Sequence, residues 1–280
     1  MTRIDGALVG RTSATVHRSW TADDAMLYAL AVGAGQMNPL SELEFTTENT
    51  AGHDQLALPT FANVAFGVEP PLPEDLDYAT MLHAEQAFEL YDVMPTAGEA
   101  HASCEVVGVY DKGSGALIET RTSARDSRGS LLATLRTSVF FRGHGGFGGD
   151  RGESARWLLP DRAPDHVVIY PTRTDQALLY RLTGDHNPLH TDPSYSSRGG
   201  FERPILHGMC TYGYTGRALL HAVAESDPKR FKAMTGRFTK PILPGETITV
   251  SIWVDGETVR FRTTDSRGAA VIDHGSAVIV

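Results

Sequence analysis

The sequence predicts an α+β protein in which an antiparallel sheet wraps around a central, nearly buried helix, with this unit built twice. Three observations lead to this prediction. The two halves of the 280-residue chain repeat one pattern, each half ends in runs typical of strands, and one long segment combines a helical apolar pattern with small residues. With 41% hydrophobic and 21% charged residues, the chain has a globular composition and enough length for a large core.

The repeat is clearest around an Asn-Pro-Leu sequence. "YALAVGAGQMNPLSELEF" begins at Tyr28 and resembles "YRLTGDHNPLHTDPSY", which begins at Tyr180; near the end of each half, "ARDSRGSLLATLRTSVFF" resembles "TTDSRGAAVIDHGSAVIV". We therefore expect an N-terminal unit over residues 1–142, a linker over 143–165 and a C-terminal unit over 166–280. The first unit lacks the polar cluster, because Gly35 or its neighbours and Ser41 stand where the second has Asp185 and His190.

The expected linker is rich in glycine and contains a G-x-G-x-x-G sequence from Gly143 to Gly148. A dinucleotide site of this type needs a helix that opens at the last glycine and an acidic residue about twenty positions further on. The following residues, "DRGESARWLLPDRAPD", have no helical pattern and include two prolines. The glycines therefore favour a linker over a nucleotide site.

The second unit carries the strand and helix signals. Residues 246–254 and 258–264 alternate between apolar and polar and are separated by Asp255-Gly256, a hairpin turn signal, and Ser266-Arg267-Gly268 predicts the next turn before a last strand. Ahead of them, His207 to Val223 predicts a helix of about four turns. Gly213 and Gly216 would let another backbone approach this helix closely.

Composition excludes several classes of protein. A formal net charge of -9 is unfavourable for a nucleic-acid partner, and no run approaches the length of a membrane span. Cys104 and Cys210 are far apart and form no CxxC, which favours a reducing compartment, so we expect a cytoplasmic protein. The stretch from Arg217 to Lys240 is locally basic and either attracts a phosphate-bearing ligand or forms a solvated helix end and loop.

The stretch "TGDHNPLHTD", from Thr183 to Asp192, carries the strongest chemical signal. In an unbroken helix Asp185 and His190 would point in different directions, but Pro188 disfavours helical dihedrals at Asn187 and forces a turn between them. A carboxylate and an imidazole on one small volume can hold a water molecule and share its proton transfers near neutral pH. The alternative is that Asp185 only caps the turn and His190 lies on the surface.

Zinc binding and thiol chemistry are two other possible uses of residues in this region. His186, His190, Asp192 and His207 could bind zinc, but Pro188 breaks the helix that would align the first two, and no cysteine pair supports a structural site. We therefore expect no metal. Cys210 has no evident base, and a lone buried cysteine is usually packing.

Gly208 follows His207 at the start of the expected helix. The first amides of a helix have no intrahelical partner, and the helix dipole favours negative charge there. A glycine at this position would let a substrate carbonyl reach the bare amide, as in an oxyanion hole. The alternative is that Gly208 only begins the helix.

These residues resemble a known family. "YRLTGDHNPLHTDP", "PILHGMCTYG" and "RFTKPILPGET", together with "LPTFANVAF", "MLHAEQAFEL" and "YDKGSG" in the first half, resemble the MaoC-like (R)-specific 2-enoyl-CoA hydratases of the hydratase 2 group over nearly the whole chain. The resemblance implies a double hot dog fold, an acyl-CoA substrate, no cofactor and a homodimer.

The resemblance also implies roles for individual residues. Asp185 and His190 would be the catalytic pair, Asn187 would orient the water, and the Gly208 amide would bind the thioester oxygen. His83, Ala84, Lys112 and Phe238 would contact the acyl-CoA, although Ala84 stands where the family has glycine. The leading hypothesis is therefore reversible hydration of a trans-2-enoyl-CoA; the alternatives are an acyl-CoA thioesterase on the same scaffold and a non-catalytic acyl-CoA-binding partner subunit.

Overall fold

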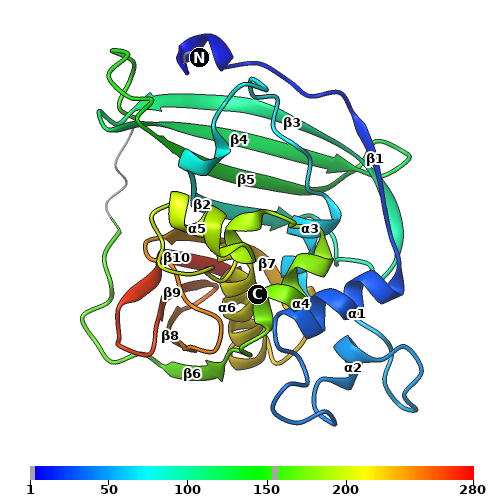
Figure 1. Ribbon diagram of the computed structural model, residues 1–280. Helices are drawn as coiled ribbons and strands as arrows, with labels where there is room; N and C mark the ends of the chain where they lie inside the picture. The colour runs from blue at the N-terminus through cyan, green and yellow to red at the C-terminus, as the bar shows by residue number, and fades with distance from the viewer. Residues whose placement is uncertain (1–3, 153–156) are drawn as a thin grey trace.

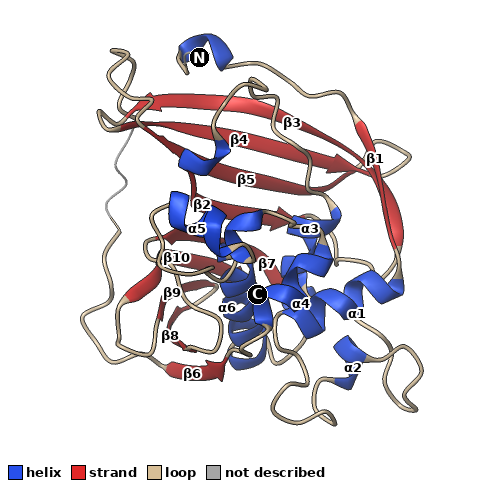
Figure 2. Cartoon of the chain, in the orientation of Figure 1, coloured by secondary structure: helices blue, strands red, loops and turns tan. Residues whose placement is uncertain are grey.

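The computed structural model describes residues 4–152 and 157–280, in which ten strands form one continuous antiparallel sheet (Figures 1 and 2). Its strand order is β1-β3-β4-β5-β2-β7-β10-β9-β8-β6. The first half of the chain contributes β1 (Val16–Trp20), β2 (Met81–Leu90), β3 (Gly98–Asp111), β4 (Gly115–Arg125) and β5 (Leu131–Arg142). The second half contributes β6 (His166–Pro171), β7 (Phe231–Phe238), β8 (Thr247–Asp255), β9 (Thr258–Thr264) and β10 (Ala270–Ile279).

The two halves meet where β2 pairs with β7. Glu85 lies opposite Arg237 in this pairing, and Phe88 lies opposite Met234. The Glu85 carboxylate accepts from Arg237 at 2.6 Å, and the ring of Phe88 stacks on Phe231 with centroids 5.9 Å apart. Backbone hydrogen bonds, an ion pair and aromatic packing therefore join the halves along this strand pair.

The strands and turns predicted for the second half are confirmed. β8 ends at Asp255 and β9 begins at Thr258, with Gly256 in the left-handed region at φ 63°, as a tight hairpin requires. β9 and β10 are joined by a turn in which Gly268 has φ 79°. The alternation of apolar and polar residues therefore identified both hairpins.

The predicted helix is α6 (Gly208–Ala222), with His207 as its N-cap and Val223 as its C-cap. A Cβ on Gly213 would lie 2.4 Å from Val32 Cγ1, and one on Gly216 would lie 2.4 Å from Thr60 Cγ2. The small residues thus let segments of the first half pack directly on the helix backbone. Figure 1 shows α6 beside the β7–β10 part of the sheet, and the helix packs against β6, β7 and β8.

Among the described residues of the first half, no helix of similar length lies in its centre. The segment "LPTFANVAF" forms only a 3-10 turn (Pro59–Phe61) and α3 (Ala62–Ala65). Gly67, Pro70 and Pro71 follow closely, and proline cannot continue a helix because it lacks an N–H and clashes with the preceding turn. The remaining helices are α1 (Ala22–Ala31), α2 (Leu43–Thr46), α4 (Gln176–Tyr180) and α5 (Pro193–Arg198), with 3-10 turns at Gly6–Leu8, Tyr78–Thr80, Arg181–Thr183, Pro188–His190 and Pro228–Arg230.

The glycine-rich segment after β5 folds around Asp111. The amides of Gly146 and Gly148 donate to the Asp111 carboxylate at 2.9 and 2.8 Å, and with Gly113 they hold the pKa of this group at about 2. Two amides of this glycine-rich stretch therefore bind a carboxylate of the same chain, and the Gly143 amide donates to the Ser114 carbonyl. They are not arranged around a phosphate site.

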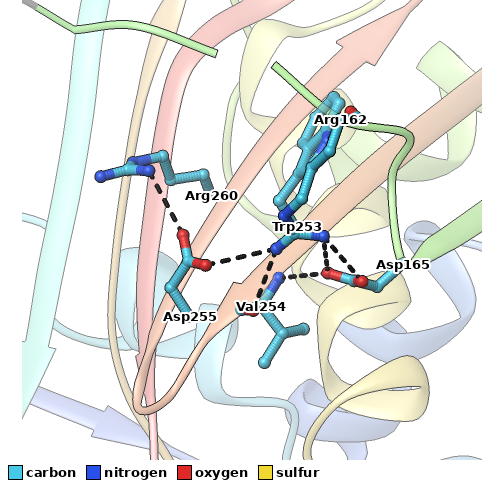
Figure 3. Close-up of polar contacts among 6 residues, drawn as sticks. All are labelled: Arg162, Asp165, Trp253, Val254, Asp255 and Arg260. Atoms are coloured by element: carbon cyan, nitrogen blue, oxygen red, sulfur yellow. Dashed lines mark hydrogen bonds and ion pairs between the residues drawn. The ribbon is translucent and has the colours of Figure 1, made fainter. Parts of the chain in front are cut away.

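The other end of the expected linker is tied to the second half (Figure 3). Arg162 donates to both oxygens of Asp165 at 2.7 Å and to the Val254 carbonyl at 3.1 Å, and Trp253 Nε1 donates to the Arg162 carbonyl at 2.9 Å. These contacts attach residues 162–165 to β8. Part of the expected linker, 153–156, lies outside the described residues, and the boundaries of the two units and the linker remain a prediction.

Within the described ranges, no helix combines the length and the apolar character that a bilayer crossing requires.

Candidate active site

A cavity of about 550 Å³ opens between the two halves of the molecule. The first half contributes residues of β2 and β5, and the second contributes the Asn-Pro-Leu loop, the start of α6 and the end of β7. Its polar and glycine lining residues include His83, Arg142, Asp185, Asn187, His190, Gly208 and Lys240. Its apolar wall includes Leu82, Phe140, Leu189, Phe201, Ile205, Leu206, Met209, Phe238, Ile242 and Val271.

The proline between Asp185 and His190 breaks the helix as predicted. Asn187 has φ -55° and ψ 121°, outside the helical region, and a single 3-10 turn, Pro188–His190, follows it. Both Asp185 and His190 consequently line the same cavity. One carboxylate oxygen of Asp185 and one ring nitrogen of His190 lie within 4.8 Å of each other.

Asp185 also shapes the loop that carries it. Its Oδ1 accepts from the Asn187 amide at 3.1 Å, and Asn187 Oδ1 accepts in turn from the Leu189 amide at 3.0 Å. The turn-capping alternative is therefore correct for one oxygen of Asp185. Among the described residues the other oxygen, Oδ2, accepts no hydrogen bond, so the exposed carboxylate keeps an acceptor for a ligand.

His190 is buried, with 9% of its surface exposed, so the alternative of a surface histidine is wrong. Its Nδ1 lies 2.9 Å from the Ile205 carbonyl, which can only accept, so Nδ1 carries the proton. Burial lowers the pKa of His190, while the Ile205 carbonyl and Asp185 oppose that change. At neutral pH His190 is therefore uncharged, and Nε2 has a free lone pair.

Of the four candidate zinc ligands, only His190 and His207 lie close together. Asp192 caps α5 by accepting from the amides of Ser194 and Tyr195, and His186 is exposed. A different set, Asp185, His190 and His207, has ligand atoms within 4.8 Å of one another. The rings of the two histidines are stacked, with centroids 3.7 Å apart, and each uses one nitrogen to donate to a backbone carbonyl. That no metal is required remains a prediction.

Gly208 is the first residue of α6 and lines the cavity beside His190. Its amide has no acceptor within the helix because the first four N–H groups of a helix are unpaired. The ring of Phe238 covers this glycine: a Cβ would lie 3.2 Å from Phe238 Cε1. Any larger residue would therefore displace either the amide or the ring.

The predicted acyl-CoA contacts divide into two groups. His83, Ala84 and Phe238 line the cavity, and the rings of His83 and Phe238 have centroids 4.7 Å apart. His83 Nε2 donates to Gln86 Oε1 at 3.1 Å, and burial lowers the pKa of His83. Lys112 is not among the cavity residues; its ammonium donates to the Arg151 carbonyl and lies 5.5 Å from the centre of the Tyr110 ring.

The basic stretch from Arg217 to Lys240 does not form one surface. Arg217 is buried, and donates to Glu42 at 2.7 Å and to the Val32 carbonyl at 2.9 Å, so neither expectation for this stretch holds at Arg217. Lys240 and Arg142 both line the cavity, and neither was predicted as a site residue. For Lys240 the sequence did offer a signal, because it lies two positions after Phe238 within "RFTKP".

One antiparallel sheet built from two related halves, with α6 packed against it and an acid–imidazole pair beside the amide at the start of that helix, defines a double hot dog protein with an enzyme-like site. Residues 19–143 match the MFE-2 hydratase 2 N-terminal domain, and residues 157–274 match the MaoC like domain. The chain belongs to the MaoC-like hydratase 2 family, which confirms the resemblance.

Relatives match this chain over most or all of its length. Enoyl-CoA hydratase ChsH3 of Mycobacterium tuberculosis is 43% identical over 250 residues, which cover 86% of each chain. 3-hydroxyacyl-thioester dehydratase Y of the same organism is 42% identical over 99% of each chain. The crystal structure of a MaoC-like dehydratase from Phytophthora capsici has a TM-score of 0.87 at 32% identity and covers 100% of this chain and 98% of its own.

One distant structure shares the fold. A Mycobacterium tuberculosis protein described as having a double hotdog fold has a TM-score of 0.59 at 15% identity, with 97% of this chain and 96% of that chain covered. At this identity only the fold is comparable. Together with the single antiparallel sheet, it confirms the predicted fold class.

Proposed function

We propose that this protein is an enoyl-CoA hydratase that interconverts trans-2-enoyl-CoA and (R)-3-hydroxyacyl-CoA in fatty-acid or related acyl-CoA metabolism. The observation that carries the proposal is that Asp185, His190 and Gly208 line one cavity, with the carboxylate and imidazole within 4.8 Å. The names of the relatives support the same reaction class.

The reaction begins with the thioester carbonyl at the Gly208 amide. A hydrogen bond from this amide draws electron density toward the oxygen, which makes the β-carbon electrophilic and stabilises the enolate that forms; donors of this kind lower barriers by about 3 kcal/mol. Phe238 packs on the glycine and fixes the space available to the thioester.

The water is held between Asp185 and His190. His190 Nε2 has a lone pair that can accept a proton from water as the water oxygen bonds to the β-carbon. The pair then returns one proton to the α-carbon, so that the double bond gains H and OH and no other reactant is consumed. Asn187 uses Oδ1 within its own turn, which leaves its Nδ2 to donate to the water.

The acyl-CoA contacts form part of the same proposal. His83 and Ala84 from β2 and Phe238 from β7 line the same cavity as the catalytic loop, and the apolar lining receives the acyl chain. Lys112 is proposed to contact the CoA moiety outside the cavity.

The test follows the loss of enoyl absorbance with crotonyl-CoA and with a longer enoyl-CoA. Wild-type protein should consume both, and chiral analysis should find the (R)-3-hydroxyacyl product. Asp185→Asn and His190→Ala should each lose about 10²- to 10⁴-fold in kcat, and activity should survive a metal chelator. Wild-type rates no higher than those of the two variants would refute the proposal. Release of free CoA thiol would instead identify a thioesterase, and binding without turnover would identify a non-catalytic partner.

We further propose a homodimer in the cytoplasm, with units at 1–142 and 166–280 and a linker at 143–165. The buried, free cysteines Cys104 and Cys210 support a reducing compartment. The end of β5 at Arg142 and the start of β6 at His166 support the boundaries. Light scattering on the purified protein should give twice the mass of one chain.

A further inference from the structure

His207 lies behind the proposed catalytic residues and takes no part in the mechanism above. It is the N-cap of α6, directly before Gly208, and only 1% of its surface is exposed. Among the described residues, the cavity lining does not include His207. Any influence of this side chain on a substrate must therefore pass through its neighbours.

Those neighbours are Asp185 and His190, the proposed catalytic pair. His207 Nε2 lies 3.2 Å from the main-chain carbonyl of Asp185, which can only accept, so Nε2 carries the proton and donates. The ring of His207 stacks on that of His190, with centroids 3.7 Å apart and an angle of 27°. The centroid of the Tyr180 ring also lies 4.9 Å from that of His207. One side chain thus contacts both Asp185 and His190 and is bonded to Gly208 through the backbone.

This arrangement requires an uncharged ring. With the proton on Nε2, Nδ1 is a bare acceptor, and it is buried without a hydrogen-bond partner among the described residues. The ionisable groups that face the ring are His190, Asp185 and Tyr180, with Arg181 nearby. Burial and the adjacent His190 lower the pKa of His207 to about 3, against the opposing effect of Asp185. His207 is therefore neutral near neutral pH.

We propose that His207 is a positioning residue, which holds the Asp185 backbone with its Nε2–H and covers one face of His190 with its ring. This inference rests on the proposed hydratase function for its kinetic consequences. It assigns two separable tasks to one side chain: the N–H fixes where the carboxylate stands relative to the Gly208 amide, and the ring keeps water away from one face of the imidazole.

Two substitutions separate these tasks. His207→Phe keeps a ring to stack on His190 but has no donor for the Asp185 carbonyl. His207→Gln keeps an N–H near the position of Nε2 but removes the stacked ring. We expect each variant to lower kcat by about 10- to 100-fold, because small misplacements of catalytic groups have effects of this size. KM should change little, since His207 does not line the cavity.

Titration of His190 distinguishes positioning from general damage and needs no turnover. Histidine-labelled protein observed by NMR should give the same His190 midpoint in wild type and His207→Phe, and a higher midpoint in His207→Gln, because water then reaches the ring and its charged form is less disfavoured. The His190 signal is assigned with His190→Ala. In wild type, His207 should remain neutral with its proton on Nε2.

The matched control is His221→Gln, which alters a histidine at the opposite end of α6, bonded to Glu42 and Ser226. It should leave kcat and the His190 midpoint unchanged. Identical His190 midpoints in wild type and both His207 variants would overturn the inference, as would kcat losses that match a loss of folded protein. If the wild type did not hydrate enoyl-CoA, the proposed function would fail while the NMR titrations would still decide the role of His207.

Discussion

Two loops of this molecule share a sequence and a turn but differ in what they do. In the second half, Asn187 Oδ1 accepts from the Leu189 amide at 3.0 Å; in the first half, Asn38 Oδ1 accepts from the Leu40 amide at 3.1 Å. The Asn-Pro-Leu turn is thus retained in both copies. The side chains on either side of it diverge.

Counted from this turn, Gln36 takes the place of Asp185 and Ser41 that of His190. Gln36 donates to the Pro171 carbonyl at 3.1 Å and accepts from the Tyr214 hydroxyl at 2.9 Å, whereas Ser41 is exposed. The first loop therefore uses its polar groups for contacts within the protein.

Glu42 strengthens that structural role. Its carboxylate accepts from Arg217 and from His221 on α6, each at 2.7 Å, and from the Gly35 amide at 3.0 Å. Burial alone would raise the pKa of Glu42, but the hydrogen bond from His221 and the charge of Arg217 outweigh it and bring the pKa to about 2. The comparison teaches that the turn is a scaffold. Whether it serves catalysis depends on the side chains it carries and on the cavity beside it.

The largest expected effect is a loss of activity when the second loop, but not the first, is altered. Asp185→Asn should lower kcat for hydration by about 10³-fold, because the neutral amide cannot share proton transfer with His190. Gln36→Ala, at the matching position, should leave kcat within about twofold and cost about 1 kcal/mol of stability through its lost hydrogen bonds. Steady-state kinetics and urea unfolding of both variants check this, and equal kinetic losses would show that the two loops do not differ as described.

The next effect concerns stability. Arg217→Met should lower the free energy of unfolding by about 3–5 kcal/mol, because it leaves the nearly buried Glu42 carboxylate without its main cation. Arg121→Met, which breaks an exposed pair with Glu105, serves as the control and should cost less than about 1 kcal/mol. Urea unfolding curves give the free energy of unfolding of both variants. Similar losses in the two would refute the idea that the buried Glu42–Arg217 pair stabilises the fold.

A smaller loss is expected at the helix terminus. Gly208→Ala keeps the amide but adds a Cβ 3.2 Å from Phe238, so either the ring or the amide must move. We expect kcat to fall about 10-fold, less than on complete loss of an oxyanion donor. Adding Phe238→Leu should recover part of the rate, and an additive loss in the double variant would contradict the steric explanation.

The smallest expected effect is a shift in the acid limb of the pH profile of kcat/KM. Burial lowers the pKa of His190 below its ordinary 6.5, so the neutral, proton-accepting form persists to lower pH than for a free histidine. kcat/KM should therefore be constant near neutral pH and fall on the acid side, with a midpoint below 6.5. A midpoint above 6.5 would mean that the charged form of His190 is favoured in the folded protein.

Local signals in the sequence predicted much of the fold of the second half and of the candidate site. The small residues of α6, the two hairpin turns and the break at Pro188 depend on neighbouring residues, and all were predicted correctly. The stacking of His207 on His190 depends on residues 17 positions apart meeting across a turn, and no local pattern encodes it. The burial of Arg217 matched neither interpretation of its basic stretch, because its partner, Glu42, lies in the other half of the chain. The short helix of the first half could have been inferred from Gly67, Pro70 and Pro71.

The pairing of β2 with β7 has a consequence for how the two copies can change. Each half supplies part of the cavity lining. Each half also pairs with the edge strand of the other, so that neither β2 nor β7 is an exposed sheet edge. Removal of the first half would therefore expose the edge of β7 and open one side of the cavity. The side chains of its Asn-Pro-Leu loop do not line the cavity, whereas its strand edge and its share of the cavity lining are both used by the other half.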